Sequence, residues 1–228
     1  MTILRERTSP EISEFLRYLA SHEEAEGSLP SLNDLSRELG ISLAGLREQL
    51  EVARALGLVE VKPRTGIRRK PYSFTPAVLN SLDYAIALNK DHFIAFADLR
   101  QHIETAYWHE AVKLLTSEDH EKLKALVKRA WEKLRGTPIE IPHSEHRELH
   151  LTIYHRLNNP FVAGLLQSYW NAYETVGLNF FTDYNYLTEV WNYHQQMVDA
   201  ICTNDVEAGY KALSEHTDLI HQLISSSQ

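Results

Sequence analysis

The feature that most constrains this fold is a long C-terminal region in which apolar residues recur with the period of an α-helix. From Thr75 onward, helical spacing predominates and the alternation of a half-buried strand is not evident. Gly, Pro and Asn residues divide the region into segments. The pattern predicts helices over about 76–88, 91–115, 118–135, 144–157, 160–178, 184–203 and 205–224. Residues 75–228 are therefore expected to form an all-α helical bundle.

The N-terminal residues have a different pattern, in which short helices precede short strands. Ser31 is expected to cap a short helix that ends before Gly40, and Ser42 is expected to cap a second helix through about Arg54. Two short helices joined by a turn that contains glycine predict a helix-turn-helix.

Two short segments follow this second helix. LVEV (58–61) and IRRK (67–70) are expected to be strands around the turn Arg64-Thr65-Gly66, which gives a wing. Residues 62–70 hold five cations and no acid, whereas the formal net charge of the whole chain is −8. Such a turn attracts a phosphate backbone, although a basic turn that merely faces solvent remains the alternative.

The segment LPSLNDLSRELGISLAGLREQLEVARALGLVEVKPRTG resembles the winged-helix domain of the GntR family of bacterial transcription regulators. The resemblance covers about residues 9–70. It implies that residues 1–74 form a winged helix-turn-helix DNA-binding domain. It also implies that Arg47 and the turn at Gly66 contact operator DNA.

Two positions depart from the GntR pattern. The family usually has Glu-Arg after LPS, where this chain has Leu32-Asn33, and Arg after the serine of the turn, where it has Leu43. Arginine is the commonest reader of guanine, so an unusual operator is expected. Asn33 could bond phosphate or adenine, and Leu43 could contact a thymine methyl group or simply pack. The expected DNA-binding residues are Ser31, Asn33, Ser42, Leu43, Arg47, Arg64, Thr65 and Gly66.

The segment HSEHRELHLTIYH, residues 143–155, holds four histidines. His146 and His150 are one helical turn apart and could bind one metal ion together. His194 and His216 lie near the apolar faces of two later helices. A single half-buried histidine is more often a core residue than a ligand, so the residues alone leave both interpretations open.

Residues of about 76–225 also resemble the all-helical FCD effector domains of GntR regulators. These domains carry an Asp-x-x-Phe-His pair and two later histidines. The resemblance implies a divalent metal bound by His146, His150, His194 and His216, with His146 in place of the usual aspartate. Four neutral histidines leave the metal site with a charge of +2, which favours an anionic ligand. Imidazole ligands suit Zn²⁺ or Ni²⁺ better than Mn²⁺ or Mg²⁺, so zinc or nickel is expected.

Arg100 is the main candidate for binding a small carboxylate effector. It lies in the helix that contributes to the effector pocket in the family, and its guanidinium could pair with a carboxylate. The alternative is an ordinary pair with Glu104 one turn along the helix. Tyr169, Asn171 and Tyr173 are weaker candidates for lining the same cavity.

Together these patterns predict a mainly α protein that acts as a ligand-responsive, homodimeric DNA-binding transcription regulator of a near-palindromic operator. No general base is recognisable, and no catalysis is predicted. The alternatives are a helical metalloenzyme with an appended winged helix and a regulator whose effector pocket holds no metal. A single cysteine, Cys202, and the lack of a signal peptide or a long apolar run predict a cytoplasmic protein without a membrane partner.

Overall fold

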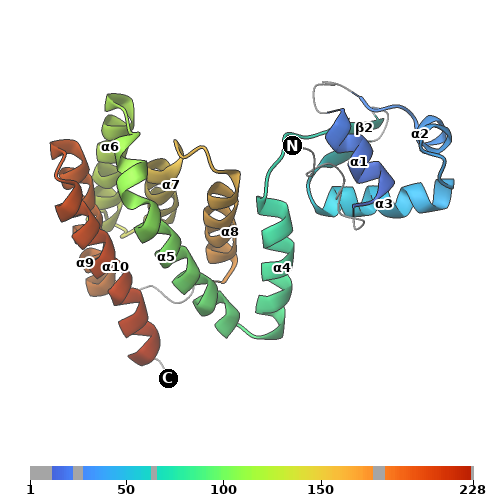
Figure 1. Ribbon diagram of the computed structural model, residues 1–228. Coiled ribbons are helices and arrows are strands. Elements are labelled where there is room, and N and C mark those ends of the chain that lie inside the picture. Colours follow the sequence, from blue (N-terminus) through green and yellow to red (C-terminus); the bar gives the residue numbers. More distant parts are fainter. Residues whose placement is uncertain (1–11, 23–27, 63–65, 177–182, 227–228) are drawn as a thin grey trace, which may run out of the picture. The chain divides into compact units, whose positions relative to one another are not determined.

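The computed structural model describes residues 12–22, 28–62, 66–176 and 183–226 of the chain. The chain divides into two units, Met1–Asn80 and Ser81–Gln228, and each is described by itself (Figure 1).

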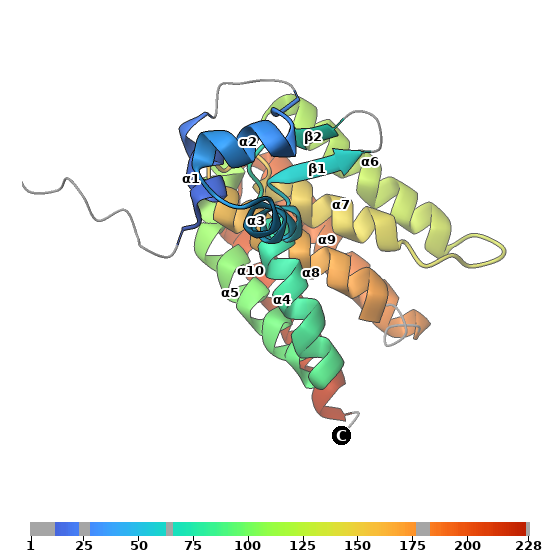
Figure 2. The same cartoon turned by 90° about the vertical axis from the view of Figure 1, so that its right-hand side faces the viewer.

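The first unit is a helix-turn-helix followed by a two-stranded hairpin (Figure 2). Its elements are α1 (Glu14–Ser21), α2 (Leu32–Leu39), α3 (Leu43–Ala55), β1 (Val59–Lys62) and β2 (Gly66–Arg69). The Ser31 hydroxyl accepts a hydrogen bond from the Asp34 amide at 3.2 Å, and that of Ser42 accepts one from the Gly45 amide at 3.1 Å. Gly40 ends α2 in the left-handed region, with φ of 66°. The expected caps are therefore confirmed, because their determinants are local in the sequence.

The hairpin is antiparallel, with Val59 opposite Arg69 and Lys62 opposite Gly66. Gly66 begins β2 with φ of 77°, a conformation that glycine adopts at no steric cost. Arg64 and Thr65 lie outside the described residues. The hairpin and the three helices enclose a small apolar core of Phe15, Leu19, Leu35, Leu46, Leu50, Ala53, Val59 and Ile67.

Helix α4 (Thr75–Leu88) begins against the end of α3 within the first unit. The Asn80 amide donates a hydrogen bond to the Ala55 carbonyl at 2.6 Å. Gly57 has φ of 72°, and a Cβ atom at this position would lie 2.4 Å from Cγ of Pro76. Glycine at this position therefore permits both the turn after α3 and the close approach of α4.

The second unit is an all-α bundle, as expected. Its further helices are α5 (Asp91–Lys113), α6 (Ser117–Leu134), α7 (His143–Tyr154), α8 (Pro160–Val176), α9 (Tyr184–Thr203) and α10 (Val206–Ser226). Asn204 in the left-handed region, with φ of 60°, joins α9 to α10, and these two helices lie side by side (Figure 1). Helix α5 packs against α7, α8 and α10, so it is central to the bundle.

Trp108 fixes the contact between α5 and α10. Its indole is fully buried and donates a hydrogen bond to the Val206 carbonyl at 3.0 Å. A Cβ atom at Gly209 would lie 2.6 Å from Cζ2 of this indole, so only glycine permits the observed approach. The contact brings α10 close to α5 and so determines where the rest of α10 lies. Among the described residues, no helix is long and apolar enough to cross a membrane.

Candidate metal centre

Three helices of the second unit bring four histidines to one point in its interior. His146 and His150 lie on α7, His194 lies on α9, and His216 lies on α10. One nitrogen from each ring lies within 4.8 Å of the others, so the four residues can surround a single ion. His150, His194 and His216 are fully buried, whereas His146 is partly exposed. The structure thus brings together all four histidines that the sequence singled out.

The donor set of this histidine cluster fits a divalent metal. Nε2 of His146, Nδ1 of His194 and both ring nitrogens of His216 are buried without a hydrogen-bond partner among the described residues. An unsatisfied buried polar atom costs about 1–3 kcal/mol, which a metal bond would offset. Histidine nitrogens bind zinc at about 2.0–2.1 Å in tetrahedral sites. The four nitrogens of the cluster are already close enough together that small side-chain movements would bring them to these distances.

The histidines of the cluster are held in the neutral form that binds metals. Burial lowers the pKa of each of the four well below the ordinary value of 6.5. Neighbouring rings and the guanidinium of Arg100 lower these pKa values further. Neutral imidazoles present a lone pair without first releasing a proton, so the cluster is prepared for an ion near neutral pH.

A buried ion pair lies beside the cluster, and its contact with one of the histidines was not expected from the sequence. Nη2 of Arg100 is 2.8 Å from Oε2 of Glu104, and both side chains are almost completely buried. Oε1 of Glu104 is 3.2 Å from Nδ1 of His150. The structure therefore has the pair between Arg100 and Glu104 that was the alternative to effector binding. The spacing of the pair was visible in the sequence, but its contact with His150 depends on how α5 packs against α7.

Aromatic side chains surround the cluster. The ring of Trp170 lies 4.7 Å from the ring of His146, and the ring of Tyr169 lies 4.9 Å from Cζ of Arg100. The hydroxyl of Tyr154 donates a hydrogen bond to the backbone carbonyl of Glu104 at 2.9 Å. These contacts link α5, α7 and α8 around the polar groups.

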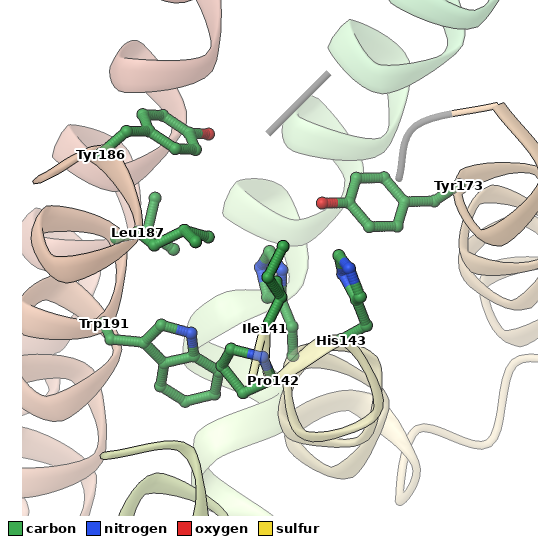
Figure 3. Close-up of a pocket in the computed structure, with 9 residues that line it drawn as sticks. Ile141, Pro142, His143, Tyr173, Tyr186, Leu187 and Trp191 are labelled. Carbon is green, nitrogen blue, oxygen red and sulfur yellow. The ribbon is translucent and has the colours of Figure 1, made fainter. Parts of the chain in front are cut away.

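A small pocket, shown in Figure 3, has His146 among the residues that line it. Tyr173 on α8 and Tyr186 on α9 point their hydroxyl groups toward this space from opposite sides, and His143 lies at its edge. The pocket is lined by Ile141, Pro142, His143, His146, Tyr173, Tyr186, Leu187, Val190 and Trp191. A ligand in this pocket would meet the cluster at His146.

The expected effector-binding residues do not all lie at this pocket. Tyr173 lines it, whereas Tyr169 packs against Arg100 deeper in the bundle. The side-chain oxygen of Asn171 accepts a hydrogen bond from Gln167 at 3.1 Å along α8, and Asn171 is not among the lining residues. Sequence reasoning missed Tyr186, because only the packing of the helices brings it to the same pocket as Tyr173.

The two acidic residues of α7 nearest the cluster point away from it. Glu145 lies 2.8 Å from Nζ of Lys133, and Glu148 lies 3.4 Å from Nζ of Lys122. Both carboxylates are therefore paired with lysines and not directed at the cluster.

In the first unit, the expected DNA-binding residues fall into two groups. Ser31 and Ser42 are helix caps. Exposed positions are Asn33, Arg47 and Gly66, whereas Leu43 is half-buried at the start of α3. The exposed face of α3 and the start of β2 are thus available to a partner.

The family comparison bears on the second unit. The FCD domain matches residues 95–219, which is more than half of the chain. The chain belongs to the FCD domain family. The match includes both members of the ion pair and all four histidines of the cluster, and it confirms the expected resemblance to FCD effector domains.

Two proteins of Escherichia coli strain K12 are similar to this FCD protein along most of their length. One, described as an uncharacterised HTH-type transcriptional regulator YieP, is 26% identical over 86% of this chain and 85% of its own. The other, described as a putative L-lactate dehydrogenase operon regulatory protein, is 23% identical over 97% of this chain and 88% of its own.

Solved structures agree on the fold. A GntR protein of Streptococcus agalactiae superimposes with a TM-score of 0.68 at 16% identity, covering 91% of this chain and 95% of that one. Escherichia coli McbR/YncC gives a TM-score of 0.52 at 19% identity, covering 95% and 100%. The expected architecture, a winged helix-turn-helix followed by a helical FCD domain, is confirmed, as is the resemblance to GntR regulators.

Proposed function

We propose that this protein is a homodimeric transcription regulator whose FCD domain binds a divalent metal ion and a small organic acid. The winged helix binds a near-palindromic operator, and the acid changes the affinity for that operator. The metal has a binding role, and the protein is not an enzyme. The alternatives are a metalloenzyme with an appended winged helix and a regulator without a metal.

The histidine cluster is the observation that carries the metal part of this proposal. Four neutral imidazoles converge within 4.8 Å, and several of their buried nitrogens have no hydrogen-bond partner among the described residues. When bound, a zinc or nickel ion would supply a Lewis-acidic centre with a net charge of +2. The four histidine ligands contribute no negative charge, so the ion would attract an anion as a further ligand.

The pocket beside His146 supports an organic acid as the second ligand. It opens on the only cluster histidine that is partly exposed, so an anion entering it reaches the ion from that side. The hydroxyl groups of Tyr173 and Tyr186, which face the same space, are suited to donate hydrogen bonds to a carboxylate (Figure 3).

DNA binding is supported by the first unit. The N-terminus of α3 directs backbone amides outward, Arg47 is exposed one turn further along, and Lys62 and Arg68 are exposed on the hairpin. A helix N-terminus and cations on an adjacent hairpin are suited to the phosphates that border a DNA groove.

Elemental analysis of protein purified without a nickel column tests the metal. About one zinc or nickel ion per chain is expected, and a metal content close to zero in protein never exposed to chelator would contradict the site. A His216→Ala variant, which removes one buried ligand, should lose the ion.

Operator affinity is then measured with metal-loaded protein, with and without a series of small carboxylates. A change in affinity with one of the acids is expected, whereas conversion of the acid to a product would favour the metalloenzyme. A response to the same acid after complete metal removal would favour the metal-free regulator.

A further inference from the structure

The unusual feature of the proposed metal site is the buried ion pair next to it. Arg100 and Glu104 lie one turn apart on α5, are 2% and 0% exposed, and lie 2.8 Å apart at the nearest atoms. Removing two charges from water is costly, and an isolated pair of this kind often contributes little to stability. The position of the pair against the histidine cluster suggests that it serves the cluster.

The two ring nitrogens of His150 have different surroundings. Nε2 lies 3.0 Å from Nε2 of His194, another ring of the cluster, and 3.2 Å from Nη2 of Arg100. Nδ1 lies 3.2 Å from Oε1 of Glu104. In metal sites, a histidine whose outer N–H donates to a carboxylate has its tautomer and its ring orientation fixed, and its other nitrogen keeps a lone pair for the metal.

Arg100 competes for the same nitrogen. Its Nη2 lies 2.8 Å from Nδ1 of His150, and a guanidinium can only donate hydrogen bonds. If Nδ1 accepts from Arg100, the hydrogen of the neutral ring is on Nε2, which then cannot bind a metal. If Nδ1 carries the hydrogen, it donates to Glu104, and Nε2 then has a lone pair that either Arg100 or a metal ion can use. The two contacts therefore exclude one another in a neutral ring.

The charge of the proposed metal site also favours a role for Glu104. Four neutral histidines bring no negative charge to a divalent ion. Of the buried acidic side chains that the structure describes, Asp119 is bonded to Arg156 and Glu145 to Lys133, whereas Glu104 contacts a histidine of the cluster.

We propose that Glu104 is the positioning residue of the metal site: it accepts the Nδ1 hydrogen of His150, directs Nε2 of that ring to the ion, and supplies a negative charge beside a ligand set that has none. In that arrangement Arg100 remains paired with Oε2 of Glu104 and its contact with His150 is lost. Metal binding therefore reorganises the hydrogen bonds of Arg100. This proposal rests on the proposed metal site.

The test is a comparison of Zn²⁺ affinities, measured by competition with a chromophoric chelator, between the full-length protein and its variants. Glu104→Gln keeps an oxygen that can accept the hydrogen bond but removes the charge. A double variant, Arg100→Met with Glu104→Met, removes the acceptor and avoids an unpaired buried charge if the single variant does not fold. The matched control is Glu145→Gln, the same change at a buried glutamate of α7 that is bonded to Lys133.

A loss of about 10- to 100-fold in Zn²⁺ affinity is expected for the double variant, and a smaller loss for Glu104→Gln. The control should bind as the wild type does. Nitrogen-15 NMR of the histidine rings gives a readout that general destabilisation would not change. Zinc-loaded wild type should show His150 as the Nδ1–H tautomer with a strongly hydrogen-bonded proton, and the double variant should lack that signal.

Two results would overturn the proposal, and they distinguish an error in the metal site from an error in the role of Glu104. If the wild type binds no zinc, the metal site itself is wrong and the role of Glu104 falls with it. If the wild type binds zinc and the folded double variant binds it equally tightly, the metal site stands and only the role of Glu104 is wrong.

Discussion

Nε2 of His150 and Nε2 of His194 lie 3.0 Å apart, although 44 residues separate them in the chain. One ring comes from α7 and the other from α9, and both are fully buried. One of these rings can donate a hydrogen bond to the other, but the second ring nitrogen of His194 and both ring nitrogens of His216 have no partner among the described residues. The metal site is therefore the natural focus of experiment.

His146 stands where related FCD domains are expected to carry aspartate. Aspartate at this position should increase the preference of the site for hard metal ions such as Mn²⁺. A His146→Asp variant adds a carboxylate and lowers the charge of a site holding a divalent ion from +2 to +1. Mn²⁺ affinity should rise on the order of tenfold, or about 1.4 kcal/mol of binding free energy, relative to Zn²⁺ affinity. Competition titrations with both metals measure this ratio. The control is His143→Asp, three residues earlier on α7, and an equal shift in that variant would contradict the assignment of His146.

Gly209→Ala should damage both stability and the metal site. The added Cβ would lie 2.6 Å from the buried indole of Trp108, which cannot retreat into solvent. The overlap should cost about 1–3 kcal/mol of unfolding free energy, more than the gain of about 1 kcal/mol in helix propensity. Because His216 lies seven residues further on the same face of α10, its ring should shift and zinc affinity should fall. Urea unfolding and zinc titration measure the two effects.

The control for Gly209→Ala is the variant Ala208→Ser at the neighbouring position. Ala208 is exposed, so serine at this position should leave both quantities nearly unchanged. A Gly209→Ala protein that is more stable than the wild type would show that α10 can move away from α5 without loss.

Asp119 should make stability depend on pH. Hydrogen bonds from Arg156, and then from Thr116, hold the pKa of Asp119 far below its usual range despite the opposing effect of burial. The folded pKa is thus below the unfolded value of about 3.9, so the ionised carboxylate contributes stability above that pH and loses it as the pH falls toward the folded pKa. Asp119→Asn should cost about 1–2 kcal/mol at pH 7, a modest value because Arg156 is partly exposed.

Guanidinium unfolding at pH 7 and at pH 3 checks the linkage to Asp119. The difference in unfolding free energy between the wild type and Asp119→Asn should be smaller at the lower pH. Glu118→Gln, one residue earlier in the exposed first turn of α6, is the matched control. A difference that stays constant between the two pH values would rule out the ionised pair as its source.

Arg47→Ala should weaken binding to the operator. The side chain is exposed on α3 near its N-terminus, where a recognition helix contacts DNA. A loss of about 1–3 kcal/mol is expected if Arg47 contacts a base, together with relaxed specificity at that base pair. Fluorescence anisotropy with operator variants measures both. Arg54→Ala, at an exposed arginine of the same helix paired with Glu51 at 2.8 Å, should have little effect. Equal losses in the two variants would indicate nonspecific attraction only.

The elements that the sequence predicted well are those with local determinants. Ser31, Gly40 and Ser42 specify helix ends through contacts within a few residues, and the observed caps agree with them. Helical periodicity located α4 to α10 within a few residues, because each helix must bury one face. The same spacing identified His146 and His150 as a pair on one face.

The tertiary structure decided which residues of other helices contact those helix faces. Glu104 was recognised only as a possible partner for Arg100, since its distance from His150 depends on how α5 packs against α7. Tyr186 reaches the pocket only because α9 lies across from α8, and Trp108 with Gly209 determines the approach of α10. Hydrogen bonds along a helix follow from residue spacing, whereas contacts between helices depend on side chains of both partners that are far apart in the chain. The sequence alone therefore determined the helices and the four histidines proposed as metal ligands, and packing decided which carboxylate and which aromatic rings surround them.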